Sequence, residues 1–262
     1  MLKSFAKTHI GQRQVNEDRC FIDKDIGLYI VADGVGGMDK GELASKLACD
    51  AIEDCIKSGQ TLSESVYSAH KAIINEININ QQQQGMATTI TAVLFNNNSY
   101  EVAWVGDSRL YLWDGNLKLL TRDDSYVELL LENGHISIDD LETHPDRNII
   151  SQALGIERKK LAINSNSGTL EKDELLLLCT DGLYSIASEE IIINAINKIS
   201  DVEKLTEHLV QIAVDKDGKD NISLISIRSD TNVPTTDNKI IPNIVRQFDA
   251  VTGKMRGVAS AT

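Results

Sequence analysis

The order of extended and helical segments along the chain restricts its fold more than any other feature. Short apolar runs typical of strands are followed by two helix-periodic segments, then more strands, two further helices and a last strand. Tight turns at 96–98 and 114–115 join neighbouring strands, which favours antiparallel pairing. The sequence therefore predicts an α+β fold in which helices lie outside two antiparallel sheets, and not a doubly wound parallel sheet.

Period and turn residues locate the individual elements. We expect strands over about 28–32, 88–95, 100–105, 110–113, 117–120, 174–179 and 222–227. We expect helices over about 39–56, 66–77, 125–134, 188–199 and 202–214, the first beginning with a capping box of Asp39 and Glu42. Weak periodicity up to Gly155 predicts a surface flap over about 125–155.

The charge of the chain limits its partners. The sequence has 26 Lys and Arg against 39 Asp and Glu, a formal net charge of −13 at pH 7. Sequence-independent nucleic-acid binding needs basic side chains that neutralise phosphates, so we expect no nucleic acid as a partner. No apolar run approaches the ~20 residues that cross a bilayer, and the N-terminus lacks the apolar stretch of a signal peptide. We therefore expect a cytoplasmic protein with no membrane partner.

Composition changes at Asp230, where a 33-residue stretch rich in Thr, Asn, Asp and Pro begins. This stretch holds four Lys and Arg and three Asp and Glu, so it carries +1 and residues 1–229 carry −14. We therefore predict a folded domain over 1–229 and a polar, flexible C-terminal tail over 230–262. The alternative is a docking segment whose apolar face is formed by Ile240, Ile241, Ile244, Val245 and Phe248.

The four cysteines form no CxxC pair, and a chain of 262 residues needs no disulfide, so we expect reduced thiols. A cysteine-based phosphatase needs an Arg six positions after its cysteine. Those positions are occupied by Ile26, Cys55, Thr61 and Ser185. The sequence therefore argues against that chemistry, and Cys179, at the end of an apolar run, is predicted to be inert core.

Four aspartates stand at strand ends or in adjoining tight turns, namely Asp33, Asp107, Asp181 and Asp220. Carboxylates that converge at the ends of buried strands repel one another unless a divalent cation balances them. Oxygen ligands select hard ions, and the chain lacks the clustered Cys or His of a zinc site, so Mg²⁺ or Mn²⁺ is favoured. The alternative for any one of these aspartates is an ordinary turn residue.

Three competing motifs fail on physical grounds. Residues 34–37 follow a strand as a dinucleotide loop would, but Asp33 would repel the pyrophosphate. Residues 215–218 begin like an EF-hand, but Ser226 stands where the bidentate Glu belongs. No Gly-rich loop precedes a Lys-Ser or Lys-Thr pair, so a P-loop NTPase is disfavoured.

Several short motifs, in order, resemble the PP2C (PPM) family of metal-dependent protein serine/threonine phosphatases in its compact bacterial form. The resemblance covers about residues 5–229. It rests on Arg13-x-x-Asn16-Glu17-Asp18, Ala32-Asp33-Gly34-Val35-Gly36-Gly37, Gly41-Glu42 with Ala44-Ser45, Thr88-Thr89, Val105-Gly106-Asp107-Ser108-Arg109, Leu120-Thr121-Arg122-Asp123, Ala153-Leu154-Gly155, Thr180-Asp181-Gly182 and Lys219-Asp220-Asn221.

The resemblance implies an α-β-β-α sandwich with a site for two Mg²⁺ or Mn²⁺ ions at one end of the sheets. It implies that Asp33 bridges both ions. One ion is completed by the Gly34 carbonyl and, through water, by Glu17, and the other is held by Asp181 and Asp220.

Two further roles are carried over from the family. Asp107 matches an aspartate that helps to hold a weaker third ion, and Arg13 matches the residue that grips the substrate phosphate in a fork of paired hydrogen bonds. The alternative for Arg13 and Glu17 is a surface ion pair, and for Asp18 a structural hydrogen bond. We favour the structural role for Asp18 alone.

The implied reaction is hydrolysis of phosphoserine and phosphothreonine in proteins by a metal-activated water, without a covalent phosphoenzyme. The expected partners are phosphoproteins produced by a separate Ser/Thr kinase, and the expected state is a monomer. Two alternatives are a catalytically silent domain that senses phosphoproteins and a metal-dependent phosphodiesterase or nuclease. All the expected ligands are present, which disfavours the first, and the acidic body disfavours the second.

The chain departs from the family pattern at three positions. Val35 stands where some members place a His that is thought to protonate the leaving group, so the general acid is unassigned, with metal-bound water as our hypothesis. Ala87 replaces a Gly before the paired threonines, and Asp124 replaces a His after Asp123. Neither replacement is at a ligand position.

Overall fold

Hydrogen-bonded strands form two antiparallel sheets in the computed structural model, which describes residues 1–36, 40–141, 143–157, 161–230, 246–249 and 254–257. The five-stranded sheet has the order β1 (Leu2–His9), β12 (Ile222–Ser229), β11 (Leu175–Cys179), β8 (Arg109–Trp113), β9 (Leu117–Leu119). The seven-stranded sheet has the order β14 (Lys254–Gly257), β13 (Arg246–Asp249), β10 (Ala162–Thr169), β7 (Ser99–Val105), β6 (Ile90–Asn96), β3 (Leu28–Ala32), β2 (Arg19–Asp23). A separate two-stranded ladder pairs β4 (Gly34–Val35) with β5 (Ala87–Thr88).

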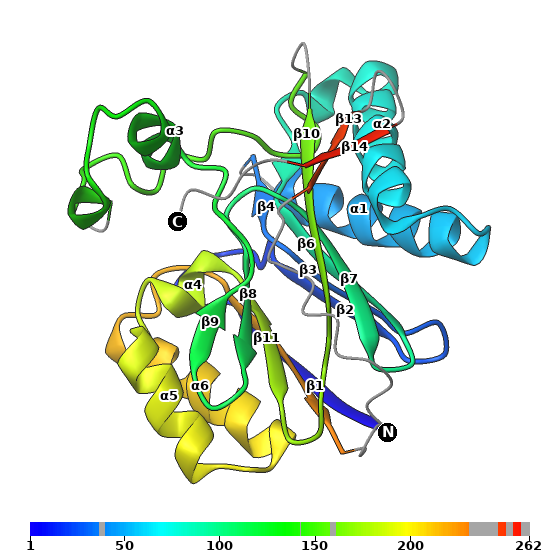
Figure 1. Cartoon of the computed structure of the whole chain (residues 1–262). Coiled ribbons are helices and arrows are strands. Elements are labelled where there is room, and N and C mark those ends of the chain that lie inside the picture. The colour runs from blue at the N-terminus through cyan, green and yellow to red at the C-terminus, as the bar shows by residue number, and fades with distance from the viewer. Residues whose placement is uncertain (37–39, 142, 158–160, 231–245, 250–253, 258–262) are drawn as a thin grey trace.

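Helices cover the outer faces of both sheets (Figure 1). The long pair α1 (Lys40–Lys57) and α2 (Leu62–Ile79) packs on the seven-stranded sheet. The helices α4 (Asp181–Tyr184), α5 (Glu189–Lys198) and α6 (Val202–Lys216) lie on the five-stranded sheet. The short helix α3 (Tyr126–Glu132) stands apart from both layers, and one-turn 3₁₀ segments occupy Gln81–Gln83 and Ile138–Asp140. The predicted α-β-β-α sandwich is confirmed.

The sheets face each other across a core of large apolar side chains. Trp104, Leu176 and Ile225 are all fully buried in it. The indole N–H of Trp104 donates to the Arg122 carbonyl at 2.8 Å, so its polar atom is satisfied. Because burial of apolar surface drives folding, this interlayer core sets how the ends of the two sheets meet.

Within residues 1–229 the sequence prediction missed the strands β1, β2 and β10, as well as the two-residue strand β4. The buried part of β10 carries polar residues, and two of them make specific bonds. Asn164 donates from Nδ2 to the Asp124 carboxylate at 3.0 Å, and Asn166 donates to the Leu120 carbonyl at 3.4 Å. A search for apolar runs overlooks a strand whose buried groups are hydrogen-bonded amides.

The N-terminal caps of the first two helices differ in what the structure describes of them. Asp39, the predicted cap of α1, lies outside the described residues. The second helix does begin with a capping box, which the sequence analysis did not identify: the Thr61 N–H donates to Glu64 Oε2 at 3.0 Å and the Glu64 N–H donates to Thr61 Oγ1 at 3.4 Å.

The predicted C-terminal tail contributes two described strands. β13 pairs with β10, with Arg246 opposite Ser165, and β14 pairs with β13. Of the apolar docking residues, Ile240, Ile241, Ile244 and Val245 lie outside the described residues.

In the predicted flap, α3 starts at the Ser125 cap, and an isolated bridge joins Ser125 to Ile150.

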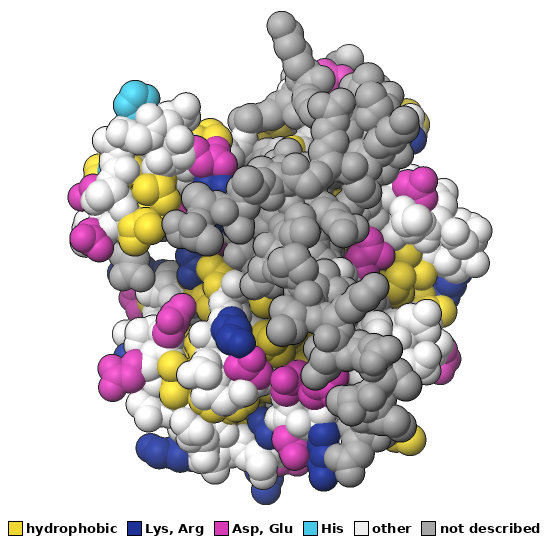
Figure 2. All heavy atoms as spheres, in the orientation of Figure 1, with side chains coloured by type: hydrophobic (Ala, Val, Ile, Leu, Met, Phe, Trp, Pro, Cys, Tyr) yellow, Lys and Arg dark blue, Asp and Glu magenta, His cyan; other side chains and the backbone are white. Residues whose placement is uncertain are grey.

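Figure 2 shows how charged side chains are distributed over one face of the molecule. On the described part of the face shown in Figure 2, acidic and basic side chains are interspersed rather than gathered into a basic stripe. Within the described segments, the structure contains no helix with the length and apolarity required for a membrane span.

The interlayer core can be tested with one substitution. We expect Leu176→Ala to lower the free energy of unfolding by about 2–5 kcal/mol, because it leaves a cavity between the sheets. Urea unfolding measures this change. The matched control is Leu119→Ala at the sheet edge, where the side chain is 39% exposed and the expected loss is below about 1 kcal/mol. Equal losses at both positions would contradict the described core.

Candidate active site at one end of the sandwich

Both sheets deliver acidic residues to the same end of the sandwich. Asp33 and Asp107 follow β3 and β7 of the seven-stranded sheet, and Asp181 and Asp220 border β11 and β12 of the five-stranded sheet. We call the acidic rim the set Glu17, Asp18, Asp33, Asp107, Asp181 and Asp220.

Asp33 lies at the centre of the acidic rim electrostatically. Desolvation raises the pKa of its carboxyl group well above the ordinary value, and repulsion from Asp18, then Asp181, adds to the shift. Asp107 and Asp220 contribute in the same direction. The Asp33 carboxyl group therefore lies within electrostatic reach of four other carboxylates from both sheets.

Paired threonines hold Asp33 in place. The Asp33 N–H donates to Thr89 Oγ1 at 3.1 Å, and the Asp33 carbonyl accepts from Thr88 Oγ1 at 2.9 Å and from the Thr89 N–H at 2.8 Å. The motif Thr88-Thr89 therefore has a physical role, which is to fix the turn that carries Asp33.

Gly34 is packed too tightly for any side chain. A Cβ at this position would lie 2.2 Å from the Gly41 carbonyl oxygen and 2.6 Å from the Glu17 carbonyl oxygen. The Gly34 N–H donates to the Glu17 carbonyl at 3.2 Å, and Glu17 Oε1 accepts from the Gly41 N–H at 3.0 Å. Glu17 is thus held against the Asp33-Gly34 turn by backbone contacts at the start of α1.

Three further carboxyl groups of the acidic rim, those of Asp107, Asp181 and Asp18, also bind protons more tightly than free aspartate. Burial raises the pKa of Asp107 to about 7, with repulsion from Asp181 as the next cause. Burial, followed by repulsion from Asp220, raises the pKa of Asp181. Burial also raises the pKa of Asp18, whose Oδ2 accepts from Thr180 Oγ1 at 2.8 Å. The structural hydrogen bond predicted for Asp18 is confirmed.

Arg13 forms an ion pair with a predicted metal ligand. Its Nε donates to Asp220 Oδ1 at 2.9 Å and its Nη2 donates to Asp220 Oδ2 at 2.8 Å, and both side chains are partly exposed. Arg13 thus forms the surface ion pair that the sequence analysis disfavoured, made with the Asp220 carboxylate through two donors of its guanidinium. Within the described residues, no three Asp, Glu, His or Cys side chains form a ready metal cage.

Asn221 is a positioning residue that the sequence analysis quoted only as part of a motif. Its Nδ2 donates to the carbonyls of Ile10 at 2.8 Å and Val15 at 3.0 Å, while its Oδ1 accepts from the Glu17 N–H at 2.8 Å. These bonds fasten the loop that carries Arg13 and Glu17 to the start of β12. The signal in the sequence was an amide beside Asp220, at a strand start.

Asp124 occupies the position where the family often has a His, and it joins two parts of the site. Its carboxylate accepts from the Gly106 N–H at 2.8 Å and from Asn164 Nδ2 at 3.0 Å. The Asp124 N–H donates to the Gly106 carbonyl at 2.9 Å. The replacement therefore still supports the turn before Asp107.

Val35, the other departure near the site, lies on β4 and is 39% exposed.

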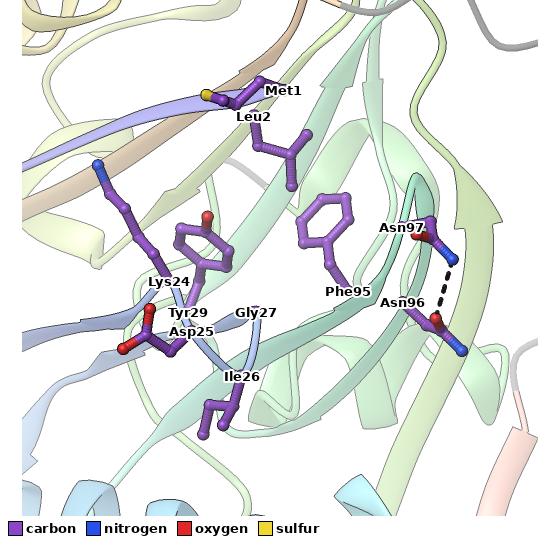
Figure 3. A pocket seen from close by; sticks show the side chains of 10 residues that line it. All are labelled: Met1, Leu2, Lys24, Asp25, Ile26, Gly27, Tyr29, Phe95, Asn96 and Asn97. Atoms are coloured by element: carbon purple, nitrogen blue, oxygen red, sulfur yellow. Dashed lines mark hydrogen bonds between the residues drawn. The ribbon is translucent and has the colours of Figure 1, made fainter.

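A cavity of about 470 Å³ lies at the opposite end of the sandwich. It is lined by the first residues of β1 and by the β2–β3 and β6–β7 turns, with Tyr29 and Phe95 in edge-to-face contact (Figure 3). β3 begins beside this cavity at Leu28 and ends at Ala32, one residue before Asp33. The acidic rim and this cavity are thus separated by the length of the strands.

The sequence of this chain matches a known protein family and several of its members. A model of a family described as protein phosphatase 2C matches residues 6–223. The serine/threonine protein phosphatase PstP of Mycobacterium tuberculosis is 32% identical over 220 residues, which are 81% of this chain and 42% of the relative. The chain therefore spans less than half the length of that protein. The serine/threonine phosphatase stp of Listeria welshimeri is 31% identical over 82% of this chain and 90% of its own length.

Solved structures agree with the sequence matches. The crystal structure of Mycobacterium tuberculosis PstP superposes with a TM-score of 0.80 at 31% identity and covers 88% of this chain and 99% of that structure. The PstP catalytic domain in complex with two manganese ions superposes with a TM-score of 0.76 at 29% identity, over 87% of this chain and 97% of that structure. The match of the family model over most of the chain, together with these relatives, shows that the chain belongs to the protein phosphatase 2C family.

Proposed function

We propose that this chain hydrolyses phosphoserine and phosphothreonine in proteins, using a water activated at a binuclear Mg²⁺ or Mn²⁺ centre in the acidic rim. The observation that carries the proposal is the Asp33 carboxyl group, desolvated and surrounded by other carboxylates at the junction of the two sheets. Relatives that carry the name serine/threonine phosphatase, and one of them solved with two manganese ions, support the same assignment.

The donor set of the acidic rim fits hard divalent cations. Its members supply oxygen atoms alone, which suits Mg²⁺ and Mn²⁺ better than zinc. Burial, followed by repulsion among these carboxylates, raises the pKa of Asp33 and of Asp181, so a bound cation would relieve an existing electrostatic cost. The positive charge of Arg13 replaces a cation only in part, because in the described contacts its guanidinium reaches Asp220 alone among the residues of the acidic rim.

The residues divide between two cations as the family pattern suggests. Asp33 would bridge both cations, with the Gly34 carbonyl and a water on Glu17 completing one. Asp181 and Asp220 would hold the other. When bound, the cations supply a nucleophilic water at neutral pH and neutralise charge that develops on the phosphoryl oxygens.

Arg13 would hold the substrate phosphate. Its guanidinium already presents two donors to a planar carboxylate, and the same fork matches two phosphoryl oxygens. With Asp220 engaged by a cation, Arg13 would leave this pair and would be available to bind the phosphate. Asn221 keeps the Arg13 loop within reach of the acidic rim by its bonds to Ile10 and Val15.

The partners follow from the reaction. The substrates would be proteins phosphorylated on Ser or Thr by a separate kinase, and we propose that the enzyme acts as a monomer. A weaker third cation at Asp107 belongs to the same proposal.

Metal removal and Asp33→Asn test the proposed reaction. We expect phosphate release from a phosphothreonine peptide with Mn²⁺, complete loss of release in excess EDTA, and a fall in kcat of about 10²-fold or more for Asp33→Asn, because the bridging charge is lost. Asp25→Asn, an exposed carboxylate in the cavity lining at the other end of the sandwich, is the matched control and should keep full activity.

Two results would contradict the reaction. Hydrolysis that persists in EDTA would exclude the metal mechanism. A wild-type chain that binds the phosphopeptide but releases no phosphate with Mn²⁺ or Mg²⁺ would favour a silent phosphoprotein-sensing domain.

Arg13→Lys tests the phosphate fork. A Lys keeps the charge but loses the paired donors, so we expect KM for the phosphopeptide to rise about 10-fold, with a smaller change in kcat. Steady-state kinetics at saturating Mn²⁺ measure both constants, and Lys198→Arg, an exchange at an exposed position of α5, is the control. An unchanged KM would remove Arg13 from substrate binding.

The raised pKa values predict how pH and metal act on stability. Asp107 has a folded pKa of about 7, above its unfolded value near 4, so the metal-free fold is favoured at acid pH and loses stability as pH rises through about 7. Asp33 and Asp181 act in the same direction. We expect Mn²⁺ to raise Tm more at about pH 7.5 than at about pH 5, measured by thermal unfolding against EDTA. An equal rise at both values would refute the electrostatic argument.

A further inference from the structure

Asp107 is a buried carboxylate whose environment is built by residues outside the acidic rim. It is 8% exposed and follows the Gly106 turn, whose φ of +103° suits glycine. The Tyr184 hydroxyl lies 3.1 Å from the Asp107 carbonyl oxygen and 3.4 Å from Asp107 Oδ2. The single phenol proton lies between these two oxygens, with the shorter contact to the carbonyl, so it can fix the Asp107 turn and its carboxylate and still leave Oδ1 for a cation.

The ring of Tyr184 packs against the guanidinium group of Arg109. The Arg109 guanidinium carbon lies 3.8 Å from the centroid of the Tyr184 ring, which is cation–π contact. Arg109 is fixed in turn by Asp123, with Nε to Oδ1 at 3.0 Å and Nη2 to Oδ2 at 2.8 Å. The ring therefore has one face against a guanidinium that is itself held by an ion pair with Asp123. Its hydroxyl points to the Asp107 turn.

The connection crosses between the sheets. Tyr184 ends α4, the one-turn helix that begins with Asp181, and Asp107 follows β7 of the seven-stranded sheet. The Tyr184 hydroxyl thus ties the Asp107 turn to the turn that carries Asp181. Two predicted cation ligands from different layers are set relative to each other by one hydrogen bond.

We propose that Tyr184 is a positioning residue, whose hydroxyl orients the Asp107 carboxylate and thereby sets the affinity of the weaker cation site to which Asp107 contributes. The inference rests on the proposed function, since it assumes that the acidic rim binds cations. Tyr184 makes no contact with substrate in this account. It acts through Asp107.

A matched pair of substitutions isolates the hydroxyl. Tyr184→Phe removes the bond to Asp107 and keeps the ring against Arg109. Tyr111→Phe removes a phenol oxygen that accepts from Arg109 Nη1 at 3.1 Å, so it disturbs the same guanidinium without touching Asp107 in any described contact. The two variants delete the same atom and differ in whether Asp107 loses its partner.

The readout is equilibrium Mn²⁺ binding without substrate, followed by electron paramagnetic resonance of the free ion. We expect Tyr184→Phe to weaken the weakest Mn²⁺ site about tenfold and to leave the tighter sites unchanged, as is typical when a hydrogen-bond partner of a ligand is lost. Tyr111→Phe should keep the wild-type isotherm. In an Asp107→Asn background, Tyr184→Phe should produce no further change, because the hydroxyl acts through that carboxylate.

The outcomes separate this inference from the proposed function. If wild type binds Mn²⁺ and hydrolyses phosphopeptide while Tyr184→Phe keeps the wild-type isotherm, the positioning role is wrong and the proposed function stands. An equal loss in Tyr111→Phe, or a further loss in the Asp107→Asn background, would also overturn the role. If wild type binds no Mn²⁺ at all, both proposals fail together.

Discussion

Repulsion among buried carboxylates is the constraint on which the rest of this structure depends. Asp33 is desolvated and feels the charges of its neighbours in the acidic rim, and Asp107 has a pKa of about 7 for the same reason. Such a cluster opposes folding unless other interactions hold it together. Neutral donors hold two of these residues: Thr88 Oγ1 and the Thr89 N–H donate to the Asp33 carbonyl, and Thr180 Oγ1 donates to the Asp18 carboxylate.

The interlayer core explains why the acidic rim exists at all. Asp33 and Asp107 arrive on one sheet and Asp181 and Asp220 on the other, so they meet only when the two sheets pack face to face. Burial of side chains such as Trp104 offsets the cost of bringing the carboxylates together. The core between the sheets thus stabilises the fold, and the carboxylates at one end destabilise it. The proposed cations would offset part of that destabilisation.

Sequence periodicity predicted the elements whose burial is apolar and continuous. The strand over 28–32 has these bounds in the structure, and β11 begins one residue later than expected and ends at Cys179. β10 was missed because its buried positions include Asn164 and Asn166, which satisfy their amides through contacts remote in sequence. β1 was missed because its exposed and half-buried positions follow no clean alternation.

The sequence by itself determined the donor chemistry of the site: carboxylate oxygens at strand ends, glycine beside Asp33, and an arginine suited to a forked contact. Only the tertiary structure decided how these groups are used. Arg13 pairs with Asp220 across 207 residues, and Tyr184 reaches Asp107 across 77. Residue type is a local property that the chain order displays. Which donor meets which acceptor depends on how two sheets stack, and that is settled by the packing of a core far from the site.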